Sequence, residues 1–157
     1  MIEEELRHIE MRRYPLRLSL RSRAQVEELL REFQLMEMSL EADEVADHSL
    51  PKRLIELVDQ FTKHFAGRID EIEAIRAAAL ARGEAEMDLV YELPVSARGS
   101  IVALGELLEE CDAYCRSDAY LLTLETPSDI VAFRRWSISE VVGQLDGNPP
   151  APWPGDV

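Results

Sequence analysis

Two cysteines one helical turn apart are the first candidates for chemistry. Cys111 and Cys115, in C-D-A-Y-C, have the spacing of half a metal site or of a redox pair. A tetrahedral zinc site needs about four Cys or His ligands, and the chain adds only three histidines, none at a suggestive spacing. Both cysteines also continue an apolar helical stripe, so we interpret them as buried core thiols. We expect no metal and no cofactor.

The signatures of common catalytic sites are missing. The sequence contains no G-x-G-x-x-G, no P-loop, no G-x-S-x-G and no H-E-x-x-H. No nucleophile comes with an assigned base. A non-enzymatic role is therefore favoured, although an unrecognised enzyme is not excluded.

The segment P-S-D-I-V-A-F-R-R-W (127–136) places a cation on the apolar side of a helix. At ~100° per residue, most apolar residues of this helix share one arc, and Arg134 falls in its middle. One interpretation is that Arg134 packs its stem in the core and pairs with one of the many carboxylates. The other is that this face is uncovered in the monomer. Arg134, with Arg135 and Trp136, would then anchor a partner protein or an anion, since Arg and Trp are typical of interface hot spots.

Charge is unevenly distributed along the 157 residues, whose net charge is −14. The window from Met11 to Val26 holds five arginines and no acidic residue, so it carries +5 and the remainder −19. A strongly negative protein repels nucleic acid and anionic lipid, so neither is expected as a partner. The basic window suits an acidic protein surface, including that of a second copy.

The sequence shows no targeting or membrane segment. Its first residues, M-I-E-E-E-L-R-H, are acidic where a signal peptide is basic, and the longest apolar run, Ala77 to Ala81, is far too short for a membrane span. Two cysteines in a chain of this length fit a reducing compartment. We expect a cytoplasmic protein.

A strand-then-helix pattern occurs twice. Leu16, Leu18 and Leu20 alternate with polar residues, which predicts a strand with Arg17 and Arg21 on its exposed face. A helical spacing of apolar residues follows. The pattern returns 75 residues later, with strand positions Tyr91, Leu93 and Val95 and a helix from Ile101. We interpret this as a βα duplication.

Each half continues with a helix introduced by a proline. The first starts at Pro51 and is expected to end at Gly67. The second has Thr126 as its predicted N-cap and Pro127 as its first residue, and Gly147 as its end. A connecting helix over 68–83, stopped by Gly83, links the halves. Residues 1–13 are predicted as either a short helix or an extra strand carrying Ile9 and Met11.

The C-terminal residues G-N-P-P-A-P-W-P-G-D-V cannot continue a helix, because proline lacks the amide donor. We expect them to be extended or disordered. Trp153 has two equal interpretations: part of a loose terminus, or an anchor that docks on its own domain or on a partner.

The predicted architecture is α+β and helix-dominated, with two βαα pseudo-repeats (14–67 and 89–147) and a small sheet. Residues 1–147 form one domain, and 148–157 form a Pro-rich tail. Two strands alone are marginal in water. We therefore expect either N-terminal strand pairing or a sheet completed by a second subunit, which makes the protein a homodimer.

Four parts of the chain resemble a family of small actinobacterial proteins that occur near, or fused to, anti-sigma-factor kinase and STAS modules. They are R-E-F-Q-L-M (31–36), L-I-E-L-V-D-Q-F (54–61), A-R-G-E-A-E-M-D-L-V-Y-E-L-P (81–94) and the run from Leu107 through Trp153. The most specific stretch is L-L-E-E-C-D-A-Y-C-R-S-D-A-Y-L-L-T-L, followed by P-S-D-I-V-A-F-R-R-W. The resemblance supplies no catalytic residues. It implies a partner-switching circuit that controls a sigma factor, in which this chain, lacking kinase nucleotide boxes, is an accessory protein.

We therefore expect a regulatory protein–protein interaction module that binds an anti-sigma or STAS protein. The expected partner-binding residues are Arg134, Arg135, Trp136, Arg17, Arg21 and Trp153. The alternative is a small anionic-ligand sensor, or an unrecognised enzyme, in which Arg134 anchors the anion.

Overall fold

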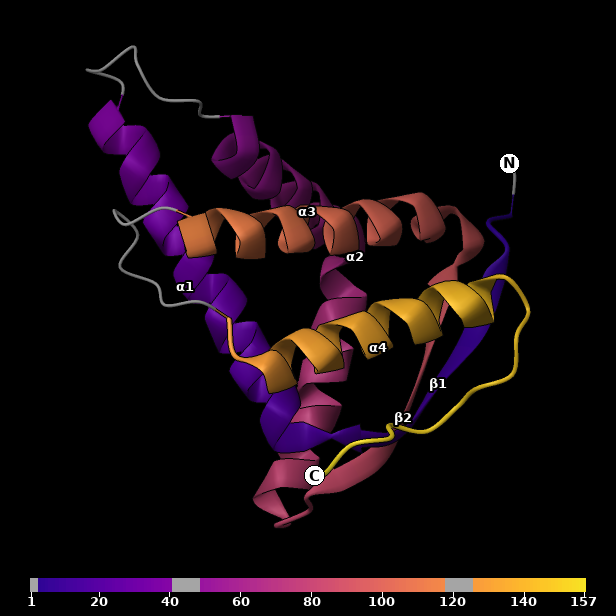
Figure 1. Cartoon of the computed structure of the whole chain (residues 1–157). Coiled ribbons are helices and arrows are strands. Elements are labelled where there is room, and N and C mark those ends of the chain that lie inside the picture. The colour runs from indigo at the N-terminus through magenta and orange to yellow at the C-terminus, as the bar shows by residue number, and fades with distance from the viewer. Residues whose placement is uncertain (1–2, 41–48, 118–125) are drawn as a thin grey trace.

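The computed structural model describes residues 3–40, 49–117 and 126–157. In chain order the elements are β1 (Leu6–Pro15), α1 (Leu16–Leu40), α2 (Ser49–Ala81), β2 (Glu86–Pro94), a 3-10 turn η1 (Val95–Ala97), α3 (Arg98–Ser117) and α4 (Ser128–Leu145) (Figure 1). The molecule is α+β and helix-dominated, as predicted. No helix in the described parts of the chain is both long and apolar enough to cross a bilayer.

β1 and β2 form one antiparallel pair, whose register runs from Leu6 opposite Pro94 to Pro15 opposite Glu86. The register shifts between Met11 and Tyr14, where Arg13 has a φ of 53°. A non-glycine residue in this left-handed region marks a bulge that re-aims the strand. The sheet therefore joins two segments far apart in the sequence.

The strand predicted at Leu16–Leu20 is wrong, because these residues open α1. Leu16 is fully buried but Leu20 is 40% exposed, so the leucine alternation does not define one buried face. Arg17 and Arg21 consequently lie on a helix. The strand lies just upstream and buries Ile9 and Met11, which confirms one of the two alternatives for residues 1–13. β2 confirms the second strand, except that Val95 belongs to η1.

The helix predicted to end at Gly67 and the connecting helix over 68–83 are one element, α2. Its axis is interrupted at Phe65, whose φ and ψ of −117° and 16° are not helical. The predicted stop at Gly83 is confirmed: Gly83 has a φ of 79°, its N–H donates to Leu80, and the N–H of Glu84 donates to Ala79. These two bonds satisfy the last carbonyls of the helix.

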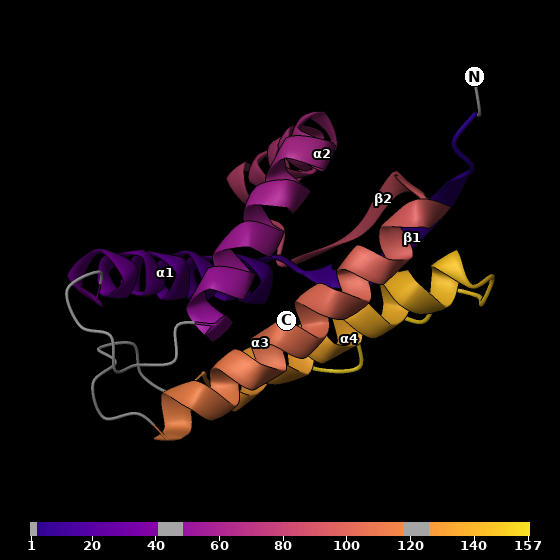
Figure 2. The ribbon, with the colours of Figure 1, turned by 90° about the horizontal axis from the view of Figure 1, so that it is seen from above.

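The core has two parts. One packs β1 and β2 against α2, α3 and α4 and includes Ile9, Phe133 and Trp153. The other lies among α1, α2 and α3 around Phe33 and contains the fully buried Cys111, as predicted for that cysteine. The Cys115 side chain lies outside what the structure describes. Seen from above, α3 and α4 run side by side, with α2 on the other side of the strands (Figure 2).

The order β-α-α-β-α-α contains two successive βαα units. The 75-residue offset nevertheless aligns Leu16–Leu20 of α1 with strand residues of β2, so its strand half is wrong. An ancient duplication and completion of the sheet by a second subunit stay predictions.

Candidate binding site between helices α3 and α4

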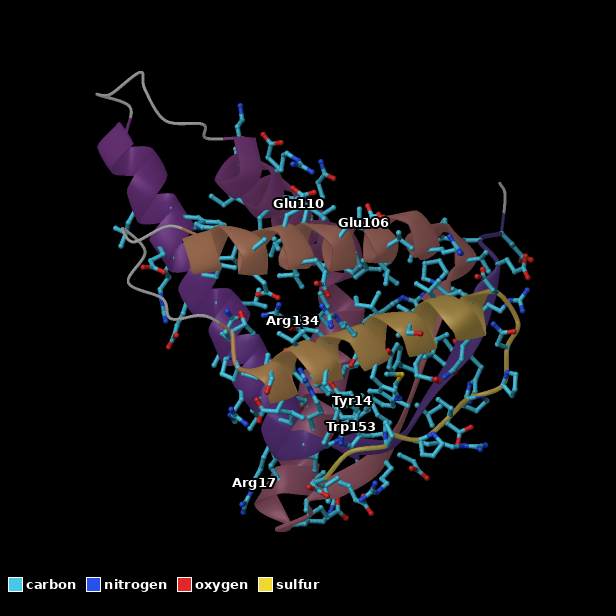
Figure 3. All side chains as sticks on the ribbon, viewed as in Figure 1. Tyr14, Arg17, Glu106, Glu110, Arg134 and Trp153 are labelled. Carbon is cyan, nitrogen blue, oxygen red and sulfur yellow. The ribbon has the colours of Figure 1, made fainter. Side chains whose placement is uncertain are left out.

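Arg134 lies inside the molecule, on the side of α4 that faces α3 (Figure 3). Its Nη1 atom is 3.1 and 3.2 Å from the two carboxylate oxygens of Asp112 on α3. Both side chains are more than 90% buried. A buried guanidinium without a counter-charge is strongly destabilising, so this pair is what permits Arg134 to occupy the apolar side of α4.

Two uncharged side chains extend the ion pair into a network. Thr126 Oγ1 donates to Asp112 Oδ1 at 2.5 Å, and Gln25 Nε2 on α1 donates to Thr126 Oγ1 at 2.9 Å. The second amino group of Arg134 closes the circuit by donating to Gln25 Oε1. Four buried polar groups from α1, α3, α4 and the segment before α4 therefore satisfy one another.

Thr126 was predicted to be the N-cap of α4, but its hydroxyl belongs to this network instead. The residue at the cap is Pro127, whose apolar ring makes no side-chain cap hydrogen bond. The Thr126 hydroxyl, one residue earlier, is engaged with Asp112. Asp129, in the first turn, accepts from the N–H of Ile130 at 2.8 Å and from Arg21 at 2.5 Å. The bond from Arg21 holds the pKa of Asp129 below its ordinary value.

One donor of the network is left over. Arg134 Nε is buried and has no hydrogen-bond partner among the described residues. An unmade bond of this kind costs about 1–3 kcal/mol. The Arg134 side chain also lines a cavity.

The cavity is a groove of about 330 Å³ between α3 and α4. Its walls are mainly apolar, with Val102 and Leu108 from α3 and Val131, Ile138 and Val142 from α4. Its polar rim includes the exposed residues Glu106, Glu109 and Arg135.

Gly105 sets the spacing of the two helices along the groove. A Cβ at this position would lie 3.2 Å from Ile138 Cγ2, a contact tighter than ordinary packing. Glycine therefore lets α3 and α4 approach at this level while the groove stays open beside them.

The structure separates the six predicted partner-binding residues. Only Arg134 and Arg135 border the groove, and Arg135 is paired with Glu109 at 2.6 Å, which raises the pKa of the guanidinium. Arg17 is exposed on α1, and Arg21 is paired with Asp129.

The two tryptophans among them join an aromatic cluster with Tyr14. Figure 3 shows Tyr14 and Trp153 on the other side of α4 from Arg134. Trp136 packs on Trp153 with ring centroids 5.4 Å apart, beside Phe133 and Tyr14. Trp153 is only 6% exposed. The tail is thus extended, and its tryptophan docks on its own domain, which is one of the two interpretations of that residue.

Sequence reasoning missed Asp112, Gln25 and Thr126 as partners of Arg134. A signal for Asp112 was present, because it follows Leu108 by four residues and therefore shares the buried side of its helix. A carboxylate in that position requires a buried cation. No comparable signal marked Gln25, whose partners are more than 100 residues away.

Metal chemistry receives no support from the described parts of the chain, where no three His, Cys, Asp or Glu side chains cluster as a metal site would require. No protein-family model matches the sequence, and no curated protein and no solved structure is significantly similar to it.

Proposed function

We propose that the protein is a regulatory interaction module whose α3–α4 groove receives an apolar helical segment of a partner protein. The observation that carries this proposal is the groove itself: about 330 Å³ of largely apolar space that opens between two antiparallel helices lying side by side. An amphipathic helix buries its apolar face in such a groove through residues spaced by three and four.

The rim of the groove indicates the charge of that helix. Glu106 is exposed and forms no ion pair with the described residues, whereas Glu109 is paired with Arg135. The chain as a whole carries −14, which favours a partner with a basic margin. Membership of a sigma-factor partner switch is the expectation from the sequence resemblance, and an anti-sigma or STAS protein is its first candidate.

Adjacent residues of α4 provide a matched test. Val131 lines the groove and is half-buried, while Ala132 is exposed and does not line it. Val131→Glu should abolish capture of the partner, because the charge would be desolvated in the groove. Ala132→Glu adds the same charge to the same helix and should leave capture unchanged.

The measurement is affinity capture with quantitative mass spectrometry, using wild type, Val131→Glu and Ala132→Glu at equal folded concentration. A protein retained by wild type and Ala132→Glu, and reduced at least tenfold with Val131→Glu, supports groove docking. Equal capture by all three baits overturns it.

A small-ligand sensor is the second candidate, favoured by the mainly apolar cavity that the Arg134 side chain lines. The cavity volume lies within the roughly 300–1,000 Å³ of small-molecule sites. Because Asp112 already balances the charge of Arg134, the site offers a neutralised ion pair and the hydroxyl of Ser139 beside an apolar wall. That chemistry suits an apolar molecule with a hydrogen-bond acceptor better than a free anion.

Thermal denaturation with 1-octanol and with octanoate separates the two candidates. A saturable rise in Tm that Val131→Glu removes would establish a small-molecule site. Unchanged melting with both compounds would leave the groove to a partner helix.

A further inference from the structure

The two edges of the sheet differ in how their main-chain groups are used. On β1, the N–H of Glu10 donates to Gln144 Oε1 at 2.8 Å, and its carbonyl accepts from Gln144 Nε2 at 2.9 Å. Glu10 therefore points its main-chain groups away from β2. In an antiparallel pair, the residue opposite it must do the same, and that residue is Val90.

The same alternation assigns Glu92, two residues further along β2, to the outer edge. Arg68 Nη1 on α2 donates to the Glu92 carbonyl at 2.6 Å, which agrees with this assignment. Within residues 3–40, 49–117 and 126–157, no other group bonds to the outward main-chain groups of Val90 and Glu92. β2 thus presents an edge to which an extended peptide can be added as a further strand by main-chain hydrogen bonding.

A cavity of about 350 Å³ lies beside this edge, between α2 and the strands. Ile72, Ile75, Val90 and Tyr91 are its apolar lining residues, and Ile75 and Val90 are each more than 40% exposed. Large apolar side chains at that exposure, next to unpaired main-chain groups, are suited to cover by an incoming strand.

The charges at this edge indicate what kind of strand fits. Glu92 and Glu71 are exposed and form no ion pair with a described residue. Asp88 is also exposed and forms no such ion pair, but its Oδ1 accepts from the N–H of Arg13 at 2.9 Å, so its other oxygen is the one left for a cation. Asp88 and Glu92 flank Val90 on the same face of β2, since side chains alternate along a strand. A second copy of β2 centred on Val90 would set Asp88 against Glu92, which is unfavourable for like charges.

We propose that the outer edge of β2 is a second binding site, which takes an extended segment of a partner protein as an added strand. The segment carries Lys or Arg opposite Asp88 and Glu92 and an apolar residue opposite Val90, so its pattern is basic-x-apolar-x-basic. Main-chain bonds to Val90 and Glu92 supply affinity, and the two carboxylates select the basic residues. This site is independent of the α3–α4 groove.

A fluorescein-labelled peptide with the sequence Thr-Lys-Thr-Val-Thr-Lys-Thr tests the proposal by fluorescence polarisation. Saturable binding is expected, with at least a tenfold loss when the lysines are replaced by glutamate. The same loss is expected when the central valine of the peptide is N-methylated, because this removes the N–H that would donate to the Val90 carbonyl. Equal binding of the N-methylated peptide overturns strand addition.

Two protein variants make the test specific to this edge. Val90→Pro removes an outward N–H and none of the bonds to β1, a change that edge strands tolerate, and it also replaces the exposed Val90 side chain; it should abolish peptide binding. The double variant Asp88→Lys, Glu92→Lys should weaken the lysine peptide tenfold or more and favour the glutamate peptide. It covers the case in which Val90→Pro fails to fold. Lysine-peptide binding that survives the double charge reversal contradicts the proposal.

Hydrogen exchange gives a residue-level readout. In the free protein, the amide of Val90 should exchange faster than that of Tyr91, which faces β1. Saturating peptide should slow Val90 exchange by at least tenfold. No change at Val90 under saturation would place the peptide elsewhere and overturn the assignment.

Discussion

The outer edge of β1 is closed by the protein itself, whereas the outer edge of β2 is nearly open. Gln144 of α4 imitates a neighbouring strand by bonding both main-chain groups of Glu10. Two residues further along β1, the N–H of Trp153 donates to the carbonyl of Arg12 at 3.0 Å. On β2, the side chain of Arg68 is the only group in the described parts of the chain that bonds to this edge. A two-stranded sheet therefore has one protected edge and one edge available for binding.

The protected edge depends on the tail. Arg13 Nη1 donates to the carbonyls of Trp153 and Gly155 at 3.1 and 2.9 Å, and the indole N–H of Trp153 donates to Asp156. The indole packs on Phe133 and Trp136. The residues that protect β1 thus also complete the core, whereas β2 is covered by a single exposed bond from Arg68.

The largest expected effect comes from Trp153→Ala, which should lower the free energy of unfolding by about 3–5 kcal/mol, as for other buried aromatic truncations. The loss removes aromatic packing and loosens the cover of Arg12. Urea unfolding followed by circular dichroism measures it. Val157→Ala, at a residue 49% exposed, is the control and should change stability by less than about 0.5 kcal/mol. Equal stability of Trp153→Ala and wild type would show that the tail does not protect β1.

Gln144→Ala should lower the free energy of unfolding by about 1–3 kcal/mol. Loss of the buried side-chain amide leaves both main-chain groups of Glu10 without partners. Gln144→Glu sharpens the test. The carboxylate still accepts from the N–H of Glu10, but it cannot donate to the carbonyl and it lies beside Glu140. We expect Glu10 amide exchange to accelerate more in the alanine variant than in the glutamate variant. Identical exchange in both would contradict the strand-like role of the amide.

Arg68→Ala should change the free energy of unfolding by less than about 1 kcal/mol, because the single bond to Glu92 is exposed. The same change should strengthen binding of the lysine peptide, since it uncovers the carbonyl and removes a positive charge. Isothermal titration of the peptide into both proteins checks the second outcome. Weaker binding would mean that Arg68 takes part in recognition.

Alkaline pH gives the smallest effect near neutrality. Burial raises the pKa of Tyr91 on β2 and of Tyr14 on β1 above the ordinary value of 10.0. The unfolded chain therefore releases these protons first, so stability is unaffected below about pH 10 and falls as the pH rises above it.

Tyr91→Phe separates the two tyrosines. The Tyr14 hydroxyl accepts a bond from Arg76 at 3.3 Å, whereas the Tyr91 hydroxyl has no hydrogen-bond partner among the described residues. We expect Tyr91→Phe to match wild type at pH 7 and to unfold at a higher pH. Urea unfolding at pH 7 and pH 11 tests this, and an unchanged alkaline midpoint would contradict it.

The sequence predicted the fold class, the second strand and the helix stop at Gly83, because each has a local cause. It misplaced the first strand for a physical reason. Leu16, Leu18 and Leu20 are spaced by two, as in a strand, but Leu16 and Leu20 are also spaced by four, as on one face of a helix. A window of five residues therefore fits both the strand and the helix period. In the true strand, Glu10 and Arg12 lie on the other face from the buried Ile9 and Met11. The bulge near Arg13 then interrupts the alternation of apolar and polar residues that would have marked the strand.

The candidate site was only partly predictable. The anomalous position of Arg134 is visible in the sequence, and so is the need for a carboxylate. Which of 31 acidic residues serves it depends on how α3 packs against α4. The role of Trp153 is likewise set by tertiary contact, since nothing near it in the chain shows that Arg12 offers a free carbonyl.

The cover of β1 also has a consequence for synthesis on the ribosome. Gln144 lies 134 residues after Glu10, whereas β1 and β2 can pair as soon as Pro94 has left the exit tunnel. During translation of the next fifty or so residues, the nascent chain can hold β1 and β2 as a pair joined through α1 and α2, while the groups that cover the edge of β1, Gln144 and Trp153, are still missing. Chains stalled in that interval should be the main substrates of chaperones that bind exposed strands, and premature termination between β2 and α4 should yield inclusion bodies rather than soluble fragments.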